Sequence, residues 1–317
     1  MPGSRYELVR RLEAYYPKDA HIRTPATARS SRAGLESQSR MPTLTHKVSS
    51  LMTPNPVVVD WRASLDEAYR ILKRFPFRHL PVVEDETLVG IVSDNDLFLS
   101  TLVLEKESGR GRRSLRSLYE SCPVGEVVER PPDTISPDDS HARVVRLMLD
   151  HGIDALPVTR NGQLVGIVTS TDLVDAFVDL CLEHGSSCDA QVGRYTRKVL
   201  SNMRLDLPVR EAIEAIDAEF GHALVLAEGE VVGVVSLREL RLGLMKELMS
   251  EPTNGRQLRL SDVISNTTAA VEPTTRLSRA ALRLVADEIG ALPVVKMGRP
   301  LGLISRTEIL RHYLSCL

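Results

Sequence analysis

The fold is decided by the stretch Leu88-Val-Gly-Ile-Val-Ser-Asp-Asn-Asp96, because its pattern occurs four times in the chain. Each copy has an apolar run around a glycine, then a Ser or Thr, then an acid three residues later. The other copies are Leu164-Val-Gly-Ile-Val-Thr-Ser-Thr-Asp172, Val231-Val-Gly-Val-Val-Ser-Leu-Arg-Glu239 and Leu301-Gly-Leu-Ile-Ser-Arg-Thr-Glu308. Their glycines are 76, 67 and 69 residues apart, which predicts four repeated units.

The residues around each copy predict a β-α-β-β-α unit. A second short strand precedes each copy, at 79–83, 155–159, 223–226 and 291–295. Turn residues separate the two strands; Asn161-Gly162 is the strongest signal, because both central positions of a tight hairpin need positive φ. A helical pattern lies before and after each hairpin, and a short strand such as 57–59 begins the unit. The fold class is therefore α/β, of the α+β type, and such small units are expected to pair.

These four units resemble cystathionine-β-synthase (CBS) domains. The resemblance rests on Met52-Thr-Pro-Asn-Pro56, on the Leu-Pro-Val strand and on the glycine-to-acid pattern, and it covers roughly residues 46–317. It implies that the units pair into two Bateman modules, at about 46–188 and 190–317, which can stack into a disc. It also implies regulatory sensors that bind adenosine nucleotides or related ligands between paired domains. In domain count alone, the chain is similar to the four-CBS regulatory subunit of the AMP-sensing protein kinase.

The domain boundaries follow from the repeat pattern. We expect an N-terminal helix and flexible tail at 1–45, unit 1 at 46–105, a basic linker at 106–121, unit 2 at 122–188, unit 3 at 190–250 and unit 4 at 258–317. Unit 3 is expected to be shortened, because Met203 and Pro208 are 5 residues apart where Met52 and Ser64 are 12 apart. About 7 residues are therefore expected to be missing, and unit 3 is interpreted as structural.

The resemblance assigns a ligand site to units 1 and 2. Asp96 and Asp172 fall at the ribose-binding position, and Ser93 and Thr169 fall at the phosphate-side hydroxyl position. A carboxylate can accept both hydrogen bonds of a cis-diol, and a hydroxyl at a helix N-terminus lies where free N–H groups favour an anion. The same Ser/Thr-x-x-acid spacing is also an ordinary capping box, and this alternative stays open for all four units.

Other residues are assigned to the phosphate and the base. Arg78 and His79 are a basic pair found in unit 1, which could engage phosphates or could be a solvated strand end. The base slot is predicted at positions that would serve equally well as core: Val57, Val58, Ile135 and Ile153. A second site in units 3 and 4 is a weaker prediction, because its motif acids are longer by one methylene and would crowd a sugar. Its candidate residues are Ser236, Glu239, Ser305, Arg306 and Glu308.

Composition and missing motifs exclude several functions. The chain has 40 Lys and Arg against 42 Asp and Glu, so it is not expected to bind polyanions in bulk. It has no long apolar run, which argues against a membrane span, and its four cysteines favour a reducing, cytoplasmic location. Cys181, His184 and Cys188 offer zinc no evident fourth ligand, so no metal site is expected. Catalytic motifs are absent, so the chain is not expected to be an enzyme.

The preferred function is an adenine-nucleotide sensor. AMP, ADP or ATP would bind between units 1 and 2 and bias contact with an unidentified protein partner; S-adenosylmethionine is a further candidate, and a role for Mg²⁺ is left open. The alternative is an interaction scaffold whose motifs are helix caps only. Nucleic-acid binding through the basic segments 1–47 and 108–119, which include Arg110, Arg112, Arg113 and Arg116, is disfavoured. A homodimer stays open.

Overall fold

The computed structural model describes residues 46–75, 77–108, 114–128, 131–184, 188–198, 202–216, 220–249, 257–264 and 270–317. The predicted N-terminal helix and tail at 1–45 lie outside these residues, as do Arg110, Arg112 and Arg113. Within the described residues, no helix combines the length and the apolar character needed to cross a membrane.

The first half of the chain contains units 1 and 2. Unit 1 consists of α2 (Val48–Leu51), β1 (Thr53–Pro54), β2 (Val59–Asp60), α3 (Leu65–Arg74), β3 (His79–Glu84), β4 (Thr87–Ser93) and α4 (Asp94–Ser108). A further helix, α5 (Leu115–Ser121), leads to unit 2, which consists of η1 (Val124–Glu126), α6 (His141–His151), β5 (Ala155–Arg160), β6 (Gln163–Thr169) and α7 (Ser170–His184). The two hairpins join at Thr87 and Gln163 into one six-stranded sheet.

The second half repeats this order. Unit 3 consists of η3 (Val192–Arg194), β7 (Asn202–Arg204), α8 (Val209–Ala215), β8 (His222–Ala227), β9 (Glu230–Ser236) and α9 (Leu237–Met249). Unit 4 consists of α10 (Leu260–Val263), α11 (Leu277–Ala286), β10 (Ala291–Lys296), β11 (Arg299–Ser305) and α12 (Arg306–Cys316). The mixed α/β fold with four β-α-β-β-α repeats is therefore confirmed.

All four hairpins turn in the same way. Two consecutive residues with positive φ lie at each tip: Asp85 and Glu86, Asn161 and Gly162, Glu228 and Gly229, Met297 and Gly298. This backbone matches the right-handed twist of the flanking strands. The expected Asn-Gly hairpin is confirmed, and unit 1 forms the same turn without a glycine.

The leading segment of each odd-numbered unit crosses to its neighbour. Thr53 pairs with Ile167 of unit 2, and Arg197 pairs with Leu303 of unit 4. The repeat glycines make room for these segments. A Cβ on Gly166 would lie 2.7 Å from Sδ of Met52, and one on Gly302 would overlap the carbonyl oxygen of Arg197. These crossings tie unit 1 to unit 2 and unit 3 to unit 4.

The same pairings correct the expected shortening of unit 3. Arg197 occupies the place of Thr53, and Pro208 precedes α8 as Ser64 precedes α3. Both pairs are 11 residues apart, so the leading segment of unit 3 has its full length. The prediction was wrong because it aligned Met203 with Met52, whereas Met203 lies on β7 and pairs in parallel with β8 as β2 pairs with β3.

The predicted basic linker is also partly ordered structure. Residues Leu115–Ser121 form α5, which begins at the Ser114 cap. Tyr119 of this helix is fully buried, and its hydroxyl donates to the carbonyl oxygen of Leu97 at 3.4 Å. Arg116 pairs with Glu120 at 3.2 Å on the exposed face of the same helix. The end of this segment therefore packs on unit 1.

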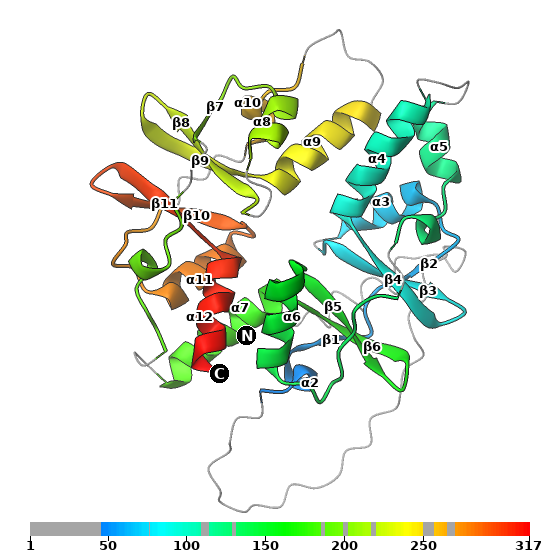
Figure 1. Cartoon of the computed structure of the whole chain (residues 1–317), viewed down its shortest axis with the longest axis horizontal. Coiled ribbons are helices and arrows are strands. Elements are labelled where there is room, and N and C mark those ends of the chain that lie inside the picture. Colours follow the sequence, from blue (N-terminus) through cyan, green and yellow to red (C-terminus); the bar gives the residue numbers. More distant parts are fainter. Residues whose placement is uncertain are drawn as a thin grey trace, which may run out of the picture.

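Two helical seams join the modules near the middle of the view in Figure 1. At one seam α4 of unit 1 contacts α9 of unit 3, and at the other α7 of unit 2 contacts α11 and α12 of unit 4. Each seam has its own apolar core, which contains buried residues of both units that meet there. The seam of units 1 and 3 also carries an ion pair between Arg238 and Asp94. At the other seam, His141 Nδ1 and the Tyr313 hydroxyl lie 2.9 Å apart.

Candidate functional site

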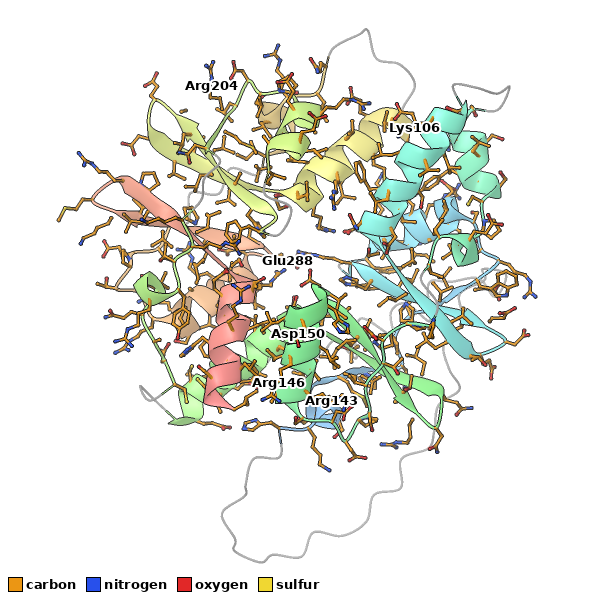
Figure 2. The ribbon with its side chains drawn as sticks, in the orientation of Figure 1. Lys106, Arg143, Arg146, Asp150, Arg204 and Glu288 are labelled. Carbon is orange, nitrogen blue, oxygen red and sulfur yellow. The ribbon has the colours of Figure 1, made fainter. Side chains whose placement is uncertain are left out.

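A central cavity of about 800 Å³ is lined by all four units. Its walls are formed by strand starts, by helix N-termini and by the C-terminal ends of α6 and α11. Arg78 comes from unit 1, Asp154 from unit 2, Arg238 from unit 3 and Arg306 from unit 4. Glu288 also lines this cavity, and Figure 2 shows it near the middle of the molecule.

Three arginines of three different units line this cavity, whose walls also carry the carboxylates of Asp154, Glu239, Asp287 and Glu288. Burial and the charge of Arg238 lower the pKa of Arg78. Burial and the charge of Arg78 lower the pKa of Arg306 to about 10. The Nε atom of Arg306 is buried and has no hydrogen-bond partner among the described residues. Arg238 is already paired with Asp94, and Asp154 partly offsets the charge of Arg78 and Arg306. Half-buried guanidinium groups with an open donor can bind an anion, so the geometry suits a phosphate group.

Two histidines lie beside the arginines at equivalent strand starts. His79 begins β3 and His222 begins β8, and burial lowers the pKa of both. His222 Nδ1 lies 2.9 Å from the carbonyl oxygen of Phe220, so Nδ1 carries the proton and Nε2 is an acceptor in the neutral ring. A Cβ on Gly290 would overlap that Nε2 atom. Gly290 therefore lets the imidazole of His222 lie across the boundary of units 3 and 4.

A second cavity of about 1200 Å³ adjoins the first on the side of units 1 and 2. The two share Arg78, Asp154 and Arg238 in their walls. Several predicted ligand residues line the second cavity: Arg78, His79, Ser93, Asp96 and Ile153. Those that line the central cavity are Arg78, Ile153, Ser236, Glu239, Ser305 and Arg306. The structure thus brings the Ser93–Asp96 motif and the arginine cluster to adjoining spaces.

The four motif acids all cap their own helices. The backbone N–H and the hydroxyl of Ser93 both donate to Oδ2 of Asp96 at 2.7 Å. Thr169 donates to Asp172 in the same way, at 2.8 and 2.7 Å. The pairs of units 3 and 4, Ser236 with Glu239 and Ser305 with Glu308, form the same two bonds. The capping alternative is therefore formed in every unit, and a ligand role for these acids stays a prediction.

Comparison with known proteins places the chain in a family. The CBS domain model matches residues 48–100, 124–179, 202–246 and 260–315. The chain belongs to the CBS domain family. The match to four repeats in one chain supports two Bateman modules, and the crossing segments pair unit 1 with unit 2 and unit 3 with unit 4.

Three relatives show how far the similarity extends. An uncharacterised 33.4 kDa protein of Thermofilum pendens is 35% identical over 128 residues, which are 40% of this chain and 42% of that protein. MJ1225 of Methanocaldococcus jannaschii is 22% identical over 274 residues, which are 79% of this chain and 92% of that protein. The crystal structure of MJ1225 covers 84% of this chain and 99% of its own, with 19% identity and a TM-score of 0.69, so the two share a fold.

The third relative, chloroplastic CBSX2 of Arabidopsis thaliana, is 30% identical over 165 residues, 45% of this chain and 68% of that protein. A crystal structure of CBSX2 in complex with AMP covers 43% of this chain and 98% of its own, with 32% identity and a TM-score of 0.36.

Some predicted residues of the CBS pair 1–2 do not line either cavity. Val58 is 3% exposed and packs with Val83 and Leu164, and Ile135 is 3% exposed in the core of units 2 and 4. Val57 packs against the core of units 1 and 3. Asp172 is 5% exposed, and neither it nor Thr169 is part of the two cavity walls. In unit 4, Glu308 is also buried and outside both cavity walls, and its Oε1 lies 3.5 Å from Nη1 of Arg311.

Sequence reasoning missed Arg238, which joins the cluster from the third CBS unit. It lies two residues after the motif hydroxyl, a position held by Asn95 in unit 1 and Thr171 in unit 2. The repeat alignment could have pointed to this position, because its equivalent in unit 4, Thr307, lines the same cavity. Its neighbour Arg241 approaches Asn95, so two arginines of α9 reach the start of α4.

Three cysteines, Cys181, Cys188 and Cys316, lie near one another at the C-terminal helix. Among the described residues, no group of three or more His, Cys, Asp or Glu side chains is arranged to hold a metal ion. Cys181 and Cys316 both approach the carbonyl oxygen of Cys188, at 3.7 and 3.8 Å. His312 Nε2 lies 2.7 Å from the same carbonyl oxygen, and its Nδ1 lies 2.7 Å from the Tyr195 hydroxyl. These contacts tie the connection between the modules to the C-terminal helix.

Proposed function

We propose that this chain is a regulatory CBS protein that binds an adenine nucleotide, with the phosphate in the central cavity and the ribose beside Ser93 and Asp96. One observation carries the proposal: Arg78, Arg238 and Arg306 line one cavity, and the buried Nε of Arg306 lacks a hydrogen-bond partner in the described chain. An anionic group between the guanidinium groups would relieve their repulsion and satisfy that donor.

The position of the ribose follows from the adjoining cavity. Asp96 lines the larger cavity, and its capping bonds from Ser93 are made to Oδ2. A carboxylate has about four lone-pair positions, so a diol can be bound while the cap is kept. Ile153 lines both cavities and offers an apolar contact between the two ligand portions.

The regulatory part of the proposal follows from the origin of the arginines. They come from units 1, 3 and 4, so a bound phosphate would contact both Bateman modules at once. Such a ligand binds more tightly to the arrangement in which the arginines converge, and it shifts the population toward that arrangement. A protein partner that contacts both modules would then sense ligand occupancy.

The similarity to CBSX2 supports AMP as the first ligand to test, because CBSX2 has been crystallised with AMP. ADP, ATP and S-adenosylmethionine follow in the same panel, with and without Mg²⁺. Their phosphate numbers and charges differ, so the order of affinity reports what the arginine cluster accepts.

A non-binding scaffold is the second candidate function, and the four formed capping boxes favour it. In this case the motif acids only stabilise helix starts, and substitution would cost about 0.5–2 kcal/mol per cap without a change in ligand affinity.

The deciding experiment is isothermal titration of the purified chain with each nucleotide, after a thermal-shift screen. Ligand at 100 times its dissociation constant should stabilise the fold by about 2.7 kcal/mol. We expect saturable binding of at least one nucleotide, and at least tenfold weaker binding by Asp96→Asn, which retains an oxygen for the cap. Asp172→Asn is the matched comparison at the capping position that lies outside both cavity walls. Absence of binding by the folded chain across the panel would favour the scaffold.

A further inference from the structure

Three thiols gather where the connection between the modules meets the C-terminal helix. Cys181 lies near the end of α7, Cys188 lies in the segment that leads into unit 3, and Cys316 is the last residue of α12. The helices α7 and α12 pack side by side (Figure 1). All four cysteines of the chain carry thiols in the structure. None of these three lines the two cavities described above, so the cluster is separate from the proposed nucleotide site.

The thiols of Cys188 and Cys316 are close enough to share a hydrogen bond. The Sγ atom of Cys316 also lies 3.8 Å from the carbonyl oxygen of Cys188, although the two residues are 128 positions apart. Both residues are half-buried, so a small reagent can reach them, whereas Cys181 is 6% exposed. Cys188 lies in a bend and Cys316 ends its helix, so small backbone shifts can bring the two sulfur atoms to bonding geometry.

His312 holds these two cysteines together. Its Nε2 atom lies 2.7 Å from the carbonyl oxygen of Cys188, and because this oxygen can only accept, Nε2 carries the proton. The Tyr195 hydroxyl, 2.7 Å from Nδ1, is then the donor to that nitrogen. The same Nε2 lies 3.7 Å from Sγ of Cys316, so its N–H can also stabilise the thiolate that must form there before a sulfur–sulfur bond does.

The reduced cluster gains little from its thiolates. Burial and the charge of Cys188 raise the pKa of Cys316 to about 11, and burial raises the pKa of Cys181 to about 12. Strongly oxidising dithiols have low pKa values, because a thiolate stabilises their reduced form. That stabilisation is absent here, and a thiol of high pKa is a poor leaving group. A disulfide in this cluster is therefore a weak oxidant that is reduced slowly.

We propose that Cys188 and Cys316 form a reversible disulfide, which ties the entrance of the module of units 3 and 4 to its end. The oxidant is a small-molecule disulfide such as oxidised glutathione. The Cys188 thiolate attacks one of its sulfur atoms and releases one molecule of the small thiol. The Cys316 thiolate then attacks the Cys188 sulfur and releases the second. Two protein thiols are thereby oxidised, one small disulfide is reduced to two thiols, and the two protein protons pass to the departing thiolates.

The disulfide would close a loop that contains nearly all of units 3 and 4, because its ends are 128 positions apart. A crosslink over so long a loop stabilises mainly by restricting the unfolded chain, and its effect grows with loop length. It would also anchor the end of α12, the helix whose first residue is Arg306 of the central cavity. Oxidation would therefore make this module harder to unfold and restrain a helix that carries one of the cavity arginines.

The test is incubation of the purified full chain in glutathione buffers of increasing oxidised fraction. The remaining thiols are then alkylated, and the chain is examined by intact-mass measurement and peptide mapping. We expect two of the four thiols to be lost, and a linked pair of peptides that contains Cys188 and Cys316. The melting temperature of the oxidised chain should exceed that of the reduced chain by about 5–15 °C, and dithiothreitol should remove this difference.

Matched variants assign the disulfide. Cys188→Ser and Cys316→Ser should each abolish the linked peptides and the shift in melting temperature. Cys122→Ser is the control, because Cys122 is half-buried like the proposed pair but lies in the other module, and this variant should form the disulfide unchanged. Four alkylatable thiols in the most oxidising buffer, a disulfide that involves Cys181 or Cys122, a disulfide between two chains, or glutathione retained on the protein would each overturn the proposal.

Discussion

Replacing Arg306 by Met should stabilise the unliganded protein and weaken anion binding, two effects of opposite sign. Arg306 is half-buried, its buried Nε has no hydrogen-bond partner in the described chain, and burial lowers the pKa of its guanidinium group to about 10. A fall of this size corresponds to a penalty of about 3 kcal/mol on the charged form, at 1.36 kcal/mol per pKa unit. Met retains much of the apolar stem, so the substitution should recover about 1–3 kcal/mol of this penalty.

The assay has two parts. Calorimetric melting without ligand should show a rise of about 2–4 °C per kcal/mol for a chain of this size class. Titration with the nucleotide found in the screen should show about 10–100-fold weaker binding, because a hydrogen bond to a charged group contributes about 1.5–3 kcal/mol. Arg299→Met is the control, since this exposed residue lies at the hairpin tip of the same unit. A lower melting temperature together with unchanged affinity would refute the view of Arg306 as a half-buried cation held for an anion.

Three further predictions concern stability. Gly302→Ala should destabilise the fold by about 3 kcal/mol in urea denaturation, because the new Cβ would overlap the carbonyl oxygen of Arg197; full stability would show that the crossing segment can shift. Glu86→Gly should stabilise by about 0.5–1 kcal/mol, since Glu86 has φ 68°, and an unchanged urea midpoint would contradict this. Burial lowers the pKa values of His79 and His222, so the contribution of their neutral rings to folding stability is present above pH 6.5 and is lost as the pH falls. The melting temperature should therefore drop between pH 7.5 and 5.5, and it should drop less in His222→Gln.

Much of the fold could be predicted from the sequence, because the signals that define each unit lie close together in the chain. The hairpin tips, the glycine-to-acid pattern and the helix before each hairpin lie within about sixty residues of one another, and the structure places them as the pattern indicates. The leading segment of unit 3 was harder to find. Arg197 pairs with Leu303 through backbone hydrogen bonds, which any residue type can form. Unit 3 therefore does not need the Thr-Pro sequence of unit 1 at this position and does not have it.

The candidate site was only partly predictable for a related reason. Arg78 and Arg306 could be predicted from the sequence of their own units. Arg238 could not, because only the contact between the two modules brings it to the same cavity as Arg78, which lies 160 positions earlier in the chain. Three apolar residues predicted to line the base slot pack in or against the apolar cores instead: Val57, Val58 and Ile135. An apolar side chain at a strand start can face a ligand or the core with equal local propensity, and packing between units decides which.

The crossing segments set the smallest piece of this chain that can stand alone. If unit 1 or unit 3 were expressed alone, its leading segment would have no strand to pair with. The hairpin of unit 2 or unit 4 would in turn expose an unpaired strand edge where Thr53 or Arg197 now pairs. Excision or grafting should therefore succeed in twos: the pair, not the repeat, is the indivisible building block of this architecture.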